Sequence, residues 1–278
     1  MDKQKITIPQ LKVKKEAGQK FRMVTAYDYL MASVVDQTPI ETILVGDSLG
    51  MVVLGYDSTV PVTMEDMIHH LRPVVKGAPH TLIVGDMPFG SYNGTEAEAV
   101  ANGTRLMKEG GADCVKLEGG EAFAPVVKAL VRAGIPVIGH IGLTPQTVSQ
   151  LGGFKVQGKD AEAAQQLVDD AMALEAAGAS ALVIECVPAP LGKVITEKLS
   201  IPTIGIGAGP DCDGQVLVAQ DLLGMFDRFV PKFVKQYANV NKIMVEALEQ
   251  YASEVAAGTF PGPDHCFGMK EEVLKKLY

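Results

Sequence analysis

The chain has 278 residues, which is enough for one large domain with a single hydrophobic core. Hydrophobic residues make up 47% and charged residues 21%, near the globular averages of about 45–50% and about 25%, which argues against disorder and against a coiled coil. The net charge is −8, and no stripe of Lys and Arg interleaves with aromatic residues, which argues against a nucleic-acid partner.

The cysteines and the N-terminal residues indicate the compartment. The four cysteines, Cys114, Cys186, Cys212 and Cys266, stand singly without a CxxC pair, so their spacing supports neither a zinc knot nor a disulfide framework. The first residues lack an apolar stretch of signal-peptide length, and the chain holds no uncharged apolar run of about 18 residues. We therefore expect a cytoplasmic protein with no membrane partner.

Seven short apolar runs recur along the chain with helical patterns between them. They cover residues 21–28, 41–48, 80–89, 113–120, 135–143, 181–188 and 201–209. Each run is nearly continuous in Val, Ile and Leu rather than alternating, which is typical of parallel strands that are buried on both faces. We expect helices to cover the sheet.

The segments between these runs predict helices. Residues 160–177 begin with Asp160 as N-cap and carry apolar residues at helical spacing. Thr63 and Asp66 resemble a capping box that opens a helix through about residue 76. The chain therefore alternates strands with helices.

This alternation favours a closed barrel. Dividing 278 residues by eight gives about 35 residues per unit, and a (β/α)8 barrel needs about 250 residues, so the barrel fits better than a six-stranded open sheet. We expect the eighth strand around 226–237 and a further helix over about 241–257. The predicted fold is α/β, a single (β/α)8 TIM barrel spanning 1–278, with an N-terminal extension (about 1–20) and a C-terminal helix and tail (about 241–278).

Four carboxylates stand at the C-terminal ends of predicted strands, where the working residues of such a barrel lie. They are Asp47, Asp86, Glu118 and Glu185. A single Asp after a strand is commonly a turn or a helix cap, but Asp47, Asp86 and Glu118 on successive strands crowd negative charge that a cation would stabilise. Carboxylate oxygens favour a hard ion such as Mg²⁺, and the absence of a histidine cluster beside them argues against zinc.

Lys116 and Glu185 add two further groups to this end of the barrel. Lys116 lies two residues before Glu118 on one strand, so both side chains point to the same face. The two form either an internal salt bridge or a site in which the Lys stabilises a metal-bound anion. Glu185 lies among apolar residues, which should raise its pKa and suit a general base, although a structural cap or a further metal ligand would also explain it.

The histidines divide by position. His140 stands at the C-terminal end of a predicted strand, where it either orients a substrate carbonyl or carboxylate or is a hydrogen-bonded core residue. His69 and His70 lie within a predicted helix and His80 opens a strand at its other end, so we expect no catalytic role for them. His265 lies in the tail, as a lid or interface residue.

Several long motifs resemble one known family. They are TAYDY (25–29), LVGDSLGM (44–51), VKLEGGE (115–121), GHIGLTPQ (139–146), GGFKVQGK (152–159), ECVP (185–188) and IGIGAG (204–209). Together, in this order, they resemble the 3-methyl-2-oxobutanoate hydroxymethyltransferase (ketopantoate hydroxymethyltransferase) family over essentially the whole chain. The tail departs from the family pattern where it reads DHCF, so the resemblance assigns no role to Cys266.

The resemblance implies roles for individual residues. The Mg²⁺ ligands of the family match Asp47, Asp86 and Glu118, which is the cluster inferred above. The proton acceptor of the family matches Glu185. Its substrate contacts match Asp47, Ser48, Asp86 and Lys116.

The resemblance also implies a reaction and an assembly. The family converts 3-methyl-2-oxobutanoate and 5,10-methylenetetrahydrofolate to 2-dehydropantoate in pantothenate biosynthesis. Mg²⁺ would acidify the C–H next to the keto group, Glu185 would remove the proton, and Mg²⁺ and Lys116 would stabilise the enolate that attacks the one-carbon unit. The implied assembly is a homo-oligomer, commonly a decamer.

Two other functions stay open at this point. A Mg²⁺-dependent carbon–carbon lyase or phosphonate mutase of the isocitrate-lyase type would share the barrel and the carboxylates, but the sequence has no KKCGH-like lyase loop. A non-catalytic barrel that binds a metal or a metabolite would not need Lys116 and Glu185 beside the three acidic residues.

Overall fold

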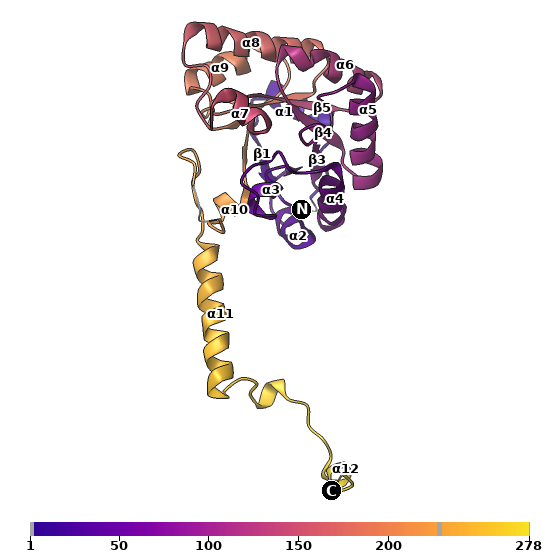
Figure 1. Ribbon diagram of the computed structural model, residues 1–278, viewed down its shortest axis with the longest axis vertical. Helices are drawn as coiled ribbons and strands as arrows, with labels where there is room; N and C mark the ends of the chain where they lie inside the picture. Colours follow the sequence, from indigo (N-terminus) through magenta and orange to yellow (C-terminus); the bar gives the residue numbers. More distant parts are fainter. Residues whose placement is uncertain (1–2, 227–229, 278) are drawn as a thin grey trace.

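The computed structural model describes residues 3–226 and 230–277 and contains a closed barrel of eight parallel strands in sequence order (Figure 1). The strands are β1 (Phe21–Thr25), β2 (Thr42–Val45), β3 (Leu82–Asp86), β4 (Cys114–Glu118), β5 (Val137–Gly142), β6 (Ala181–Glu185), β7 (Thr203–Ile206) and β8 (Gly214–Leu217). β8 pairs with β1 and closes the barrel, so the predicted (β/α)8 fold is confirmed.

Helices surround the barrel and continue beyond it. They are α1 (Ile8–Glu16), α2 (Tyr29–Asp36), α3 (Leu49–Val52), α4 (Met64–Gly77), α5 (Glu96–Arg105), α6 (Ala124–Arg132), α7 (Val148–Leu151), α8 (Ala161–Ala176), α9 (Ala189–Lys198), α10 (Ala219–Leu222), α11 (Val240–Ala257) and α12 (Glu271–Leu274). Single turns of other helix types are η1 (Leu106–Gly110), η2 (Glu121–Phe123), η3 (Pro145–Thr147) and η4 (Pro263–His265).

The apolar runs form the expected buried strands. Every residue of β2, β3 and β4 is buried, because one face of each strand fills the barrel and the other packs against helices. The capping signals are also confirmed: the Thr63 hydroxyl accepts from the Asp66 amide at the start of α4, and the Asp160 carboxylate accepts from the Ala163 amide at the start of α8.

The position predicted for the eighth strand is wrong. The strand that closes the barrel is β8 at Gly214–Leu217, and no described residue of 226–237 belongs to a strand; residues 227–229 lie outside the described part of the chain. β8 begins with Gly214, and its exposed Gln215 interrupts the apolar residues. The strand therefore lacks the continuous apolar run that marked the other seven.

The N-terminal extension closes one end of the barrel. Leu11 of α1 is fully buried against residues that point into the barrel, including Phe21 and Val183. Lysines of the extension pair with acidic residues that stand just before strands, at Lys14–Glu41 (3.1 Å), Lys5–Asp113 (2.7 Å) and Lys15–Asp213 (2.9 Å). The segment therefore lies across the N-terminal ends of the strands, and the opposite end remains for chemistry.

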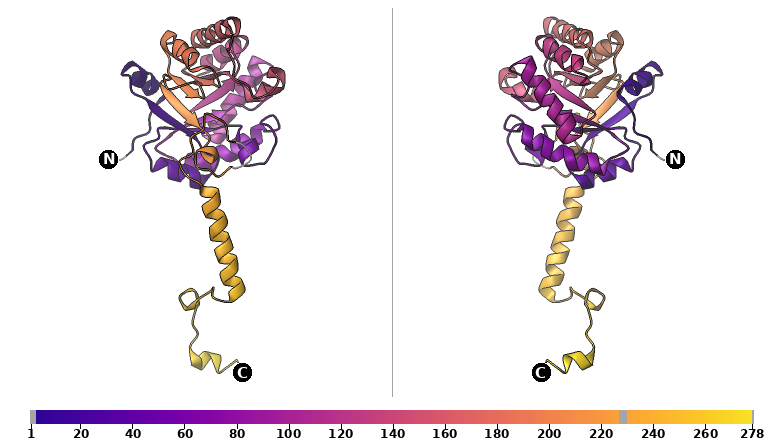
Figure 2. Two further views of the ribbon diagram at one scale, coloured as in Figure 1. Left: turned by 90° about the vertical axis from the view of Figure 1, so that its left-hand side faces the viewer. Right: turned by 90° about the vertical axis from the view of Figure 1, so that its right-hand side faces the viewer.

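The last part of the chain does not pack on the barrel. α11, the predicted C-terminal helix, projects away from the barrel in all views, and α12 lies still further out (Figures 1 and 2). None of the residues of α11 is buried. No helix within the described residues is long and apolar enough to cross a membrane.

The closure of the barrel by α1 predicts a stability difference between two positions of one helix. Leu11→Ala should lower the free energy of unfolding by about 2–5 kcal/mol, because it leaves a cavity at a fully buried position. Val13→Ala is the control, since Val13 is 58% exposed and its truncation should change stability by less than about 0.5 kcal/mol. Denaturant titration of both variants measures this; equal effects would contradict a closing role for α1.

Candidate active site

Five charged or titratable side chains form a continuous series of contacts at the C-terminal end of the barrel. In order of contact they are Asp86, Lys116, Glu118, His140 and Glu185. The strand register explains the neighbours, because Asp86 is level with Lys116, and Glu118 is level with His140. The structure thus brings together the predicted residues of β3, β4, β5 and β6.

Lys116 bridges two carboxylates of this series. Its Nζ lies 2.8 Å from Asp86 Oδ1 and 3.8 Å from Glu118 Oε1, and the side chain is only 5% exposed. Burial by itself lowers the pKa of Lys116, but the charges of Asp86, Glu118 and Asp47 outweigh burial and raise it. The ammonium is therefore held in its charged form.

Asp47 lies beside Asp86. Asp47 directly follows Gly46 after β2, and its backbone amide donates to Asp86 Oδ2 at 3.2 Å. Burial raises the pKa of Asp47 well above its ordinary value, and the charges of Asp86 and Glu118 raise it further. Burial also raises the pKa of Asp86, against the opposing effect of Lys116. The buried acidic groups are thus only partly compensated by the lysine.

His140 lies between two carboxylates. Its Nδ1 is 3.4 Å from Glu118 Oε1 and its Nε2 is 3.2 Å from Glu185 Oε2. Burial and the nearby Lys116 lower the pKa of His140, but the interactions with Glu118 and Glu185 more than offset them and raise the pKa to about 9. The pKa of Glu118 is lowered despite its burial, because His140 and Lys116 stabilise its charge. Both ring nitrogens of His140 therefore face carboxylates.

Glu185 is the last residue of β6, and its side chain is 14% exposed. Its sequence neighbours are apolar as predicted, but the fold adds His140 from the next strand. Gly142 of β5 is level with Glu185, and a Cβ there would lie 2.1 Å from the Glu185 carbonyl oxygen. With φ of 94° as well, position 142 requires glycine for this close approach.

The donor atoms fit a hard divalent cation held by few protein ligands. No three His, Cys, Asp or Glu side chains in the described part of the chain are arranged to hold a metal ion together. Asp47 and Asp86 nevertheless present adjacent buried carboxylates with a deficit of positive charge. Mg²⁺ is commonly held by one or two carboxylates, with substrate and water completing an octahedron of oxygen atoms. Glu118 is already engaged by its neighbours, so a direct contact between Glu118 and a cation stays a prediction.

Three uncharged residues of the site escaped the sequence analysis. The Tyr27 hydroxyl lies 2.8 Å from the hydroxyl of Ser48, next to Asp47. Gln146 donates to Asp47 and contacts Tyr92, whose hydroxyl lies 3.1 Å from the Glu118 carbonyl oxygen. Tyr27 and Gln146 lie in motifs shared with the known family, but nothing in the spacing of single polar residues distinguishes them from turn residues.

The remaining histidines are not among the charged residues that meet at this site. His70 Nδ1 contacts the carbonyl of Tyr27 at 2.7 Å, and His80 Nδ1 pairs with Asp36 at 2.9 Å ahead of β3. The ring of His265 lies tilted against Phe260 in the tail, with ring centroids 5.1 Å apart.

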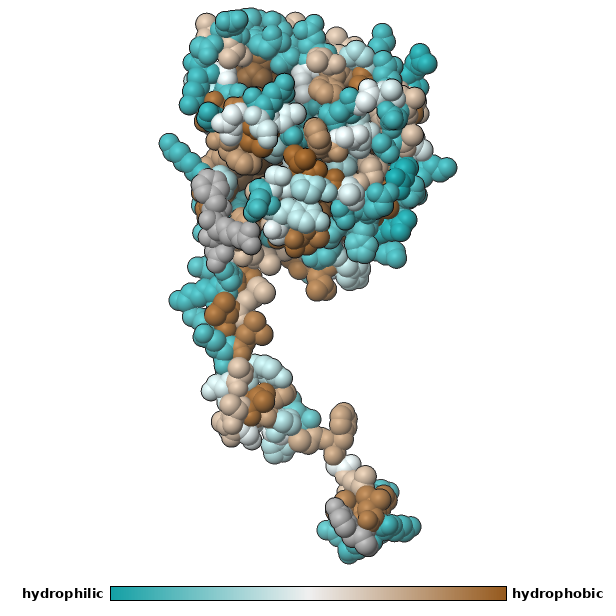
Figure 3. Space-filling model, in the orientation of Figure 1, coloured by the Kyte–Doolittle hydropathy of each residue, from teal (hydrophilic) through white to brown (hydrophobic). Residues whose placement is uncertain are grey.

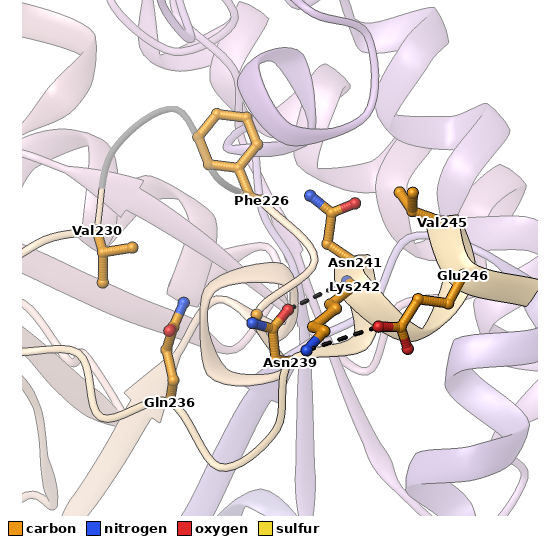
Figure 4. A pocket seen from close by; sticks show the side chains of 9 residues that line it. Phe226, Val230, Gln236, Asn239, Asn241, Lys242, Val245 and Glu246 are labelled. Carbon is orange, nitrogen blue, oxygen red and sulfur yellow. Dashed lines mark hydrogen bonds and ion pairs between the residues drawn. The ribbon is translucent and has the colours of Figure 1, made fainter. Parts of the chain in front are cut away.

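A separate hollow of about 550 Å³ lies where α11 begins (Figure 4). Phe226, Val230 and Asn239 line it, and so do Lys242 and Glu246, whose charged atoms are 3.6 Å apart. None of the residues at the strand ends lines this hollow, so it is distinct from the candidate active site.

Comparison with known proteins shows the family of the chain. Residues 5–263 match the family described as ketopantoate hydroxymethyltransferase. The chain belongs to this family. The chain is 66% identical over 274 residues to the 3-methyl-2-oxobutanoate hydroxymethyltransferase of Heliobacterium modesticaldum, with 99% of both chains covered. It is 57% identical over 274 residues to the enzyme of the same name from Syntrophomonas wolfei, again with 99% of both chains covered.

Solved structures with the same fold include enzymes of other activities. A phosphonopyruvate hydrolase in complex with oxalate and Mg²⁺ superposes with a TM-score of 0.61 at 15% identity, covering 97% of this chain and 94% of that one. A 2,3-dimethylmalate lyase of the PEP mutase/isocitrate lyase superfamily superposes with a TM-score of 0.61 at 14% identity, covering 94% and 93%. At this identity the likeness establishes the fold alone.

The buried charge of Asp47 predicts that this carboxylate lowers the stability of the metal-free protein and strengthens the binding of a cation. A carboxyl whose pKa is raised by folding destabilises the folded state at pH values above its ordinary pKa, because the unfolded chain ionises more readily there. Asp47→Asn should therefore raise the unfolding temperature at neutral pH without metal. A gain of about 1 kcal/mol corresponds to about 2–4 °C for a chain of this size. Differential scanning calorimetry measures the change, with exposed Asp211→Asn as control.

Mg²⁺ should act against this difference in unfolding temperature. Added Mg²⁺ should raise the unfolding temperature of the wild type more than that of Asp47→Asn, because the variant lacks one charged ligand. If metal-free Asp47→Asn unfolds at a lower temperature than the metal-free wild type, the charge of Asp47 is not uncompensated. If Mg²⁺ stabilises both proteins equally, Asp47 is not a ligand of the ion.

Proposed function

We propose that this chain transfers a hydroxymethyl group to 3-methyl-2-oxobutanoate and forms 2-dehydropantoate, with 5,10-methylenetetrahydrofolate as the one-carbon donor. The observation that carries the proposal is the convergence, in a chain of this family, of an acidic pair, a buried ammonium and a separate carboxylate at one end of the barrel. This set offers a place for a 2-oxo acid and a base for its C–H. The cytoplasmic location expected from the sequence stays a prediction.

Asp47 and Asp86 would hold Mg²⁺, with Glu118 supporting them. Bound there, the ion would act as a Lewis acid that polarises the 2-oxo acid and makes its neighbouring C–H more acidic. Ser48 adds a hydroxyl next to Asp47, oriented by Tyr27 at 2.8 Å, for the substrate carboxylate. Lys116 would place its positive charge where negative charge develops on the substrate oxygen.

Glu185 would accept the proton. His140 holds Oε2 of Glu185 at 3.2 Å, and Oε1 makes no hydrogen bond or ion pair with any described residue. Oε1 is therefore the oxygen available for the substrate proton. The partial exposure of Glu185, against the burial of the other carboxylates, also fits a group that meets the substrate.

His140 serves this proposal best as a positioning residue. Its ring bridges Glu118 and Glu185, so it fixes the orientation of the base relative to the acidic cluster. A direct contact between His140 and the substrate stays a prediction.

The alternative reaction class is the Mg²⁺-dependent carbon–carbon lyase or phosphonate mutase considered from the sequence. Incubation with 3-methyl-2-oxobutanoate, Mg²⁺ and the folate donor, followed by mass spectrometry, separates the two. Folate-dependent formation of 2-dehydropantoate supports the transferase, whereas its absence with intact, Mg²⁺-binding protein would refute it.

The role of Glu185 predicts that proton removal can be separated from carbon transfer. In D₂O with Mg²⁺ and no folate, the wild type should exchange the C3 proton of 3-methyl-2-oxobutanoate, which NMR detects as loss of that signal. Glu185→Gln is nearly isosteric but cannot accept the proton, so exchange should fall by about 10²-fold or more. Glu197→Gln is the control, because this side chain is 66% exposed on α9.

Two results would contradict this assignment. Exchange at the wild-type rate in Glu185→Gln would place the base elsewhere, with His140 as the next candidate. Loss of Mg²⁺ binding in the same variant would assign Glu185 to the metal ligands instead.

We also propose that the chain forms a homo-oligomer, as a decamer, through α11. Apolar residues follow helical spacing along this helix and are about half or more exposed: Met244 (49%), Leu248 (64%), Tyr251 (55%) and Val255 (47%). Hydrophobic patches along the projecting helix are visible in Figure 3. A monomer would leave this stripe in water, whereas a second copy of the chain would bury it.

Light scattering tests this assembly. The wild type should give a mass several times the 29.5 kDa of one chain at micromolar concentration. Leu248→Glu should lower the mass, because it places a charge in the apolar stripe, whereas Gln250→Glu adds the same charge outside the stripe and should not. A monomeric wild type, or equal masses of the two variants, would contradict assembly through α11.

A further inference from the structure

Gln146 connects two acidic residues of the site that the sheet itself does not connect. Asp47 follows β2 and Glu118 ends β4, and β3 lies between these strands. No strand pairing therefore sets the position of one carboxylate relative to the other. Gln146, in η3 after β5, is only 3% exposed and reaches both.

The contacts of Gln146 use every polar group of its side chain. Its Nε2 donates to Asp47 Oδ2 at 2.8 Å and to the Met87 carbonyl at 3.0 Å, and its backbone amide donates to Glu118 Oε2 at 3.0 Å. The Tyr92 hydroxyl donates to Gln146 Oε1 at 2.7 Å. This set determines which end of the amide faces Asp47, since only the NH₂ group can donate to both oxygens.

We propose that Gln146 is a positioning residue that aligns Asp47 and Glu118 for the divalent cation, and that Tyr92 holds Gln146 in place. The inference rests on the cation site of the proposed function. It assigns a role to a residue outside the acidic cluster, since Gln146 offers the cation neither charge nor a free oxygen.

The chemistry of the amide suits this role. A neutral donor fixes Asp47 Oδ2 without cancelling the negative charge that attracts the cation. A Lys or Arg in the same place would cancel that charge. Among the described residues this is the one hydrogen bond to the Asp47 side chain, so Oδ1 remains for the cation. Residues that orient metal ligands typically contribute about 10–100-fold to metal affinity.

Tyr92 is the support behind this amide. Its ring is 1% exposed and packs edge-on against Phe123 with centroids 5.4 Å apart. Its hydroxyl also accepts from the Glu118 amide at 3.2 Å. Loss of the hydroxyl should therefore loosen Gln146 without changing any group that faces Asp47.

The test measures metal binding without turnover. Mn²⁺ replaces Mg²⁺ as a paramagnetic ion with the same preference for oxygen ligands, and electron paramagnetic resonance reports the free ion during titration of the full-length protein. Gln146→Met should weaken Mn²⁺ binding by about 10–100-fold and Tyr92→Phe by less. The double variant should be no weaker than Gln146→Met, because both residues act through one contact.

The control variant is Thr144→Val in the same loop. The Thr144 hydroxyl pairs with Thr147 at 2.7 Å and contacts no carboxylate, so its loss should lower stability without changing Mn²⁺ affinity. In turnover assays, Gln146→Met should raise the Mg²⁺ concentration needed for half-maximal rate and leave kcat at saturating Mg²⁺ far less changed. A merely structural role would lower the unfolding temperature and leave this concentration unchanged.

The outcomes separate this inference from the proposed function. If the wild type binds Mn²⁺ and Gln146→Met binds it equally well, Gln146 does not position the ligands and the inference is overturned. If Gln146→Met does not fold, wild-type affinity in Tyr92→Phe overturns it in the same way. A wild type that binds no Mn²⁺ would remove the cation site itself, and the inference with it.

Discussion

A single buried ammonium faces more buried negative charge than it can neutralise, and the rest of the barrel end depends on this imbalance. Lys116 lies 2.8 Å from Asp86 Oδ1 and 3.8 Å from Glu118 Oε1, yet burial and mutual repulsion still raise the pKa of Asp47 and of Asp86. Such a site lowers the stability of the fold when no cation is bound, and it favours the binding of a cation with an anionic ligand. The surrounding core must supply the stability that this site lacks.

The parallel pairing of the strands sets where these charged side chains lie relative to one another. Because all eight strands end on one side, residues level with each other on neighbouring strands become contacts, as Asp86 and Lys116 do. The same pairing places Glu118 against His140 of β5, and His140 in turn contacts Glu185 on the neighbouring strand β6. The acidic cluster is thereby set apart from Glu185, which is the separation that the proposed division into cation ligands and proton acceptor requires.

Much of this arrangement could be predicted from the sequence, because buried parallel strands and carboxylates at their ends leave plain patterns. Lys116 and Glu118 share a face by strand periodicity alone. The strand at Gly214–Leu217 escaped because a glycine and an exposed glutamine interrupt its apolar pattern. Gln146 and Tyr92 escaped for a different reason: their contacts depend on how β2, β4 and β5 are arranged in space, which no local pattern records.

The projecting helix has a consequence for how such a chain can change over evolution. Every residue assigned to the chemistry lies between positions 27 and 185, whereas α11 begins at Val240 and buries none of its own residues. With assembly through α11 as proposed, substitutions along this helix can change how copies of the chain associate without replacing a residue assigned to the chemistry. The residues assigned to the chemistry and the residues of the projecting helix can therefore change at independent rates.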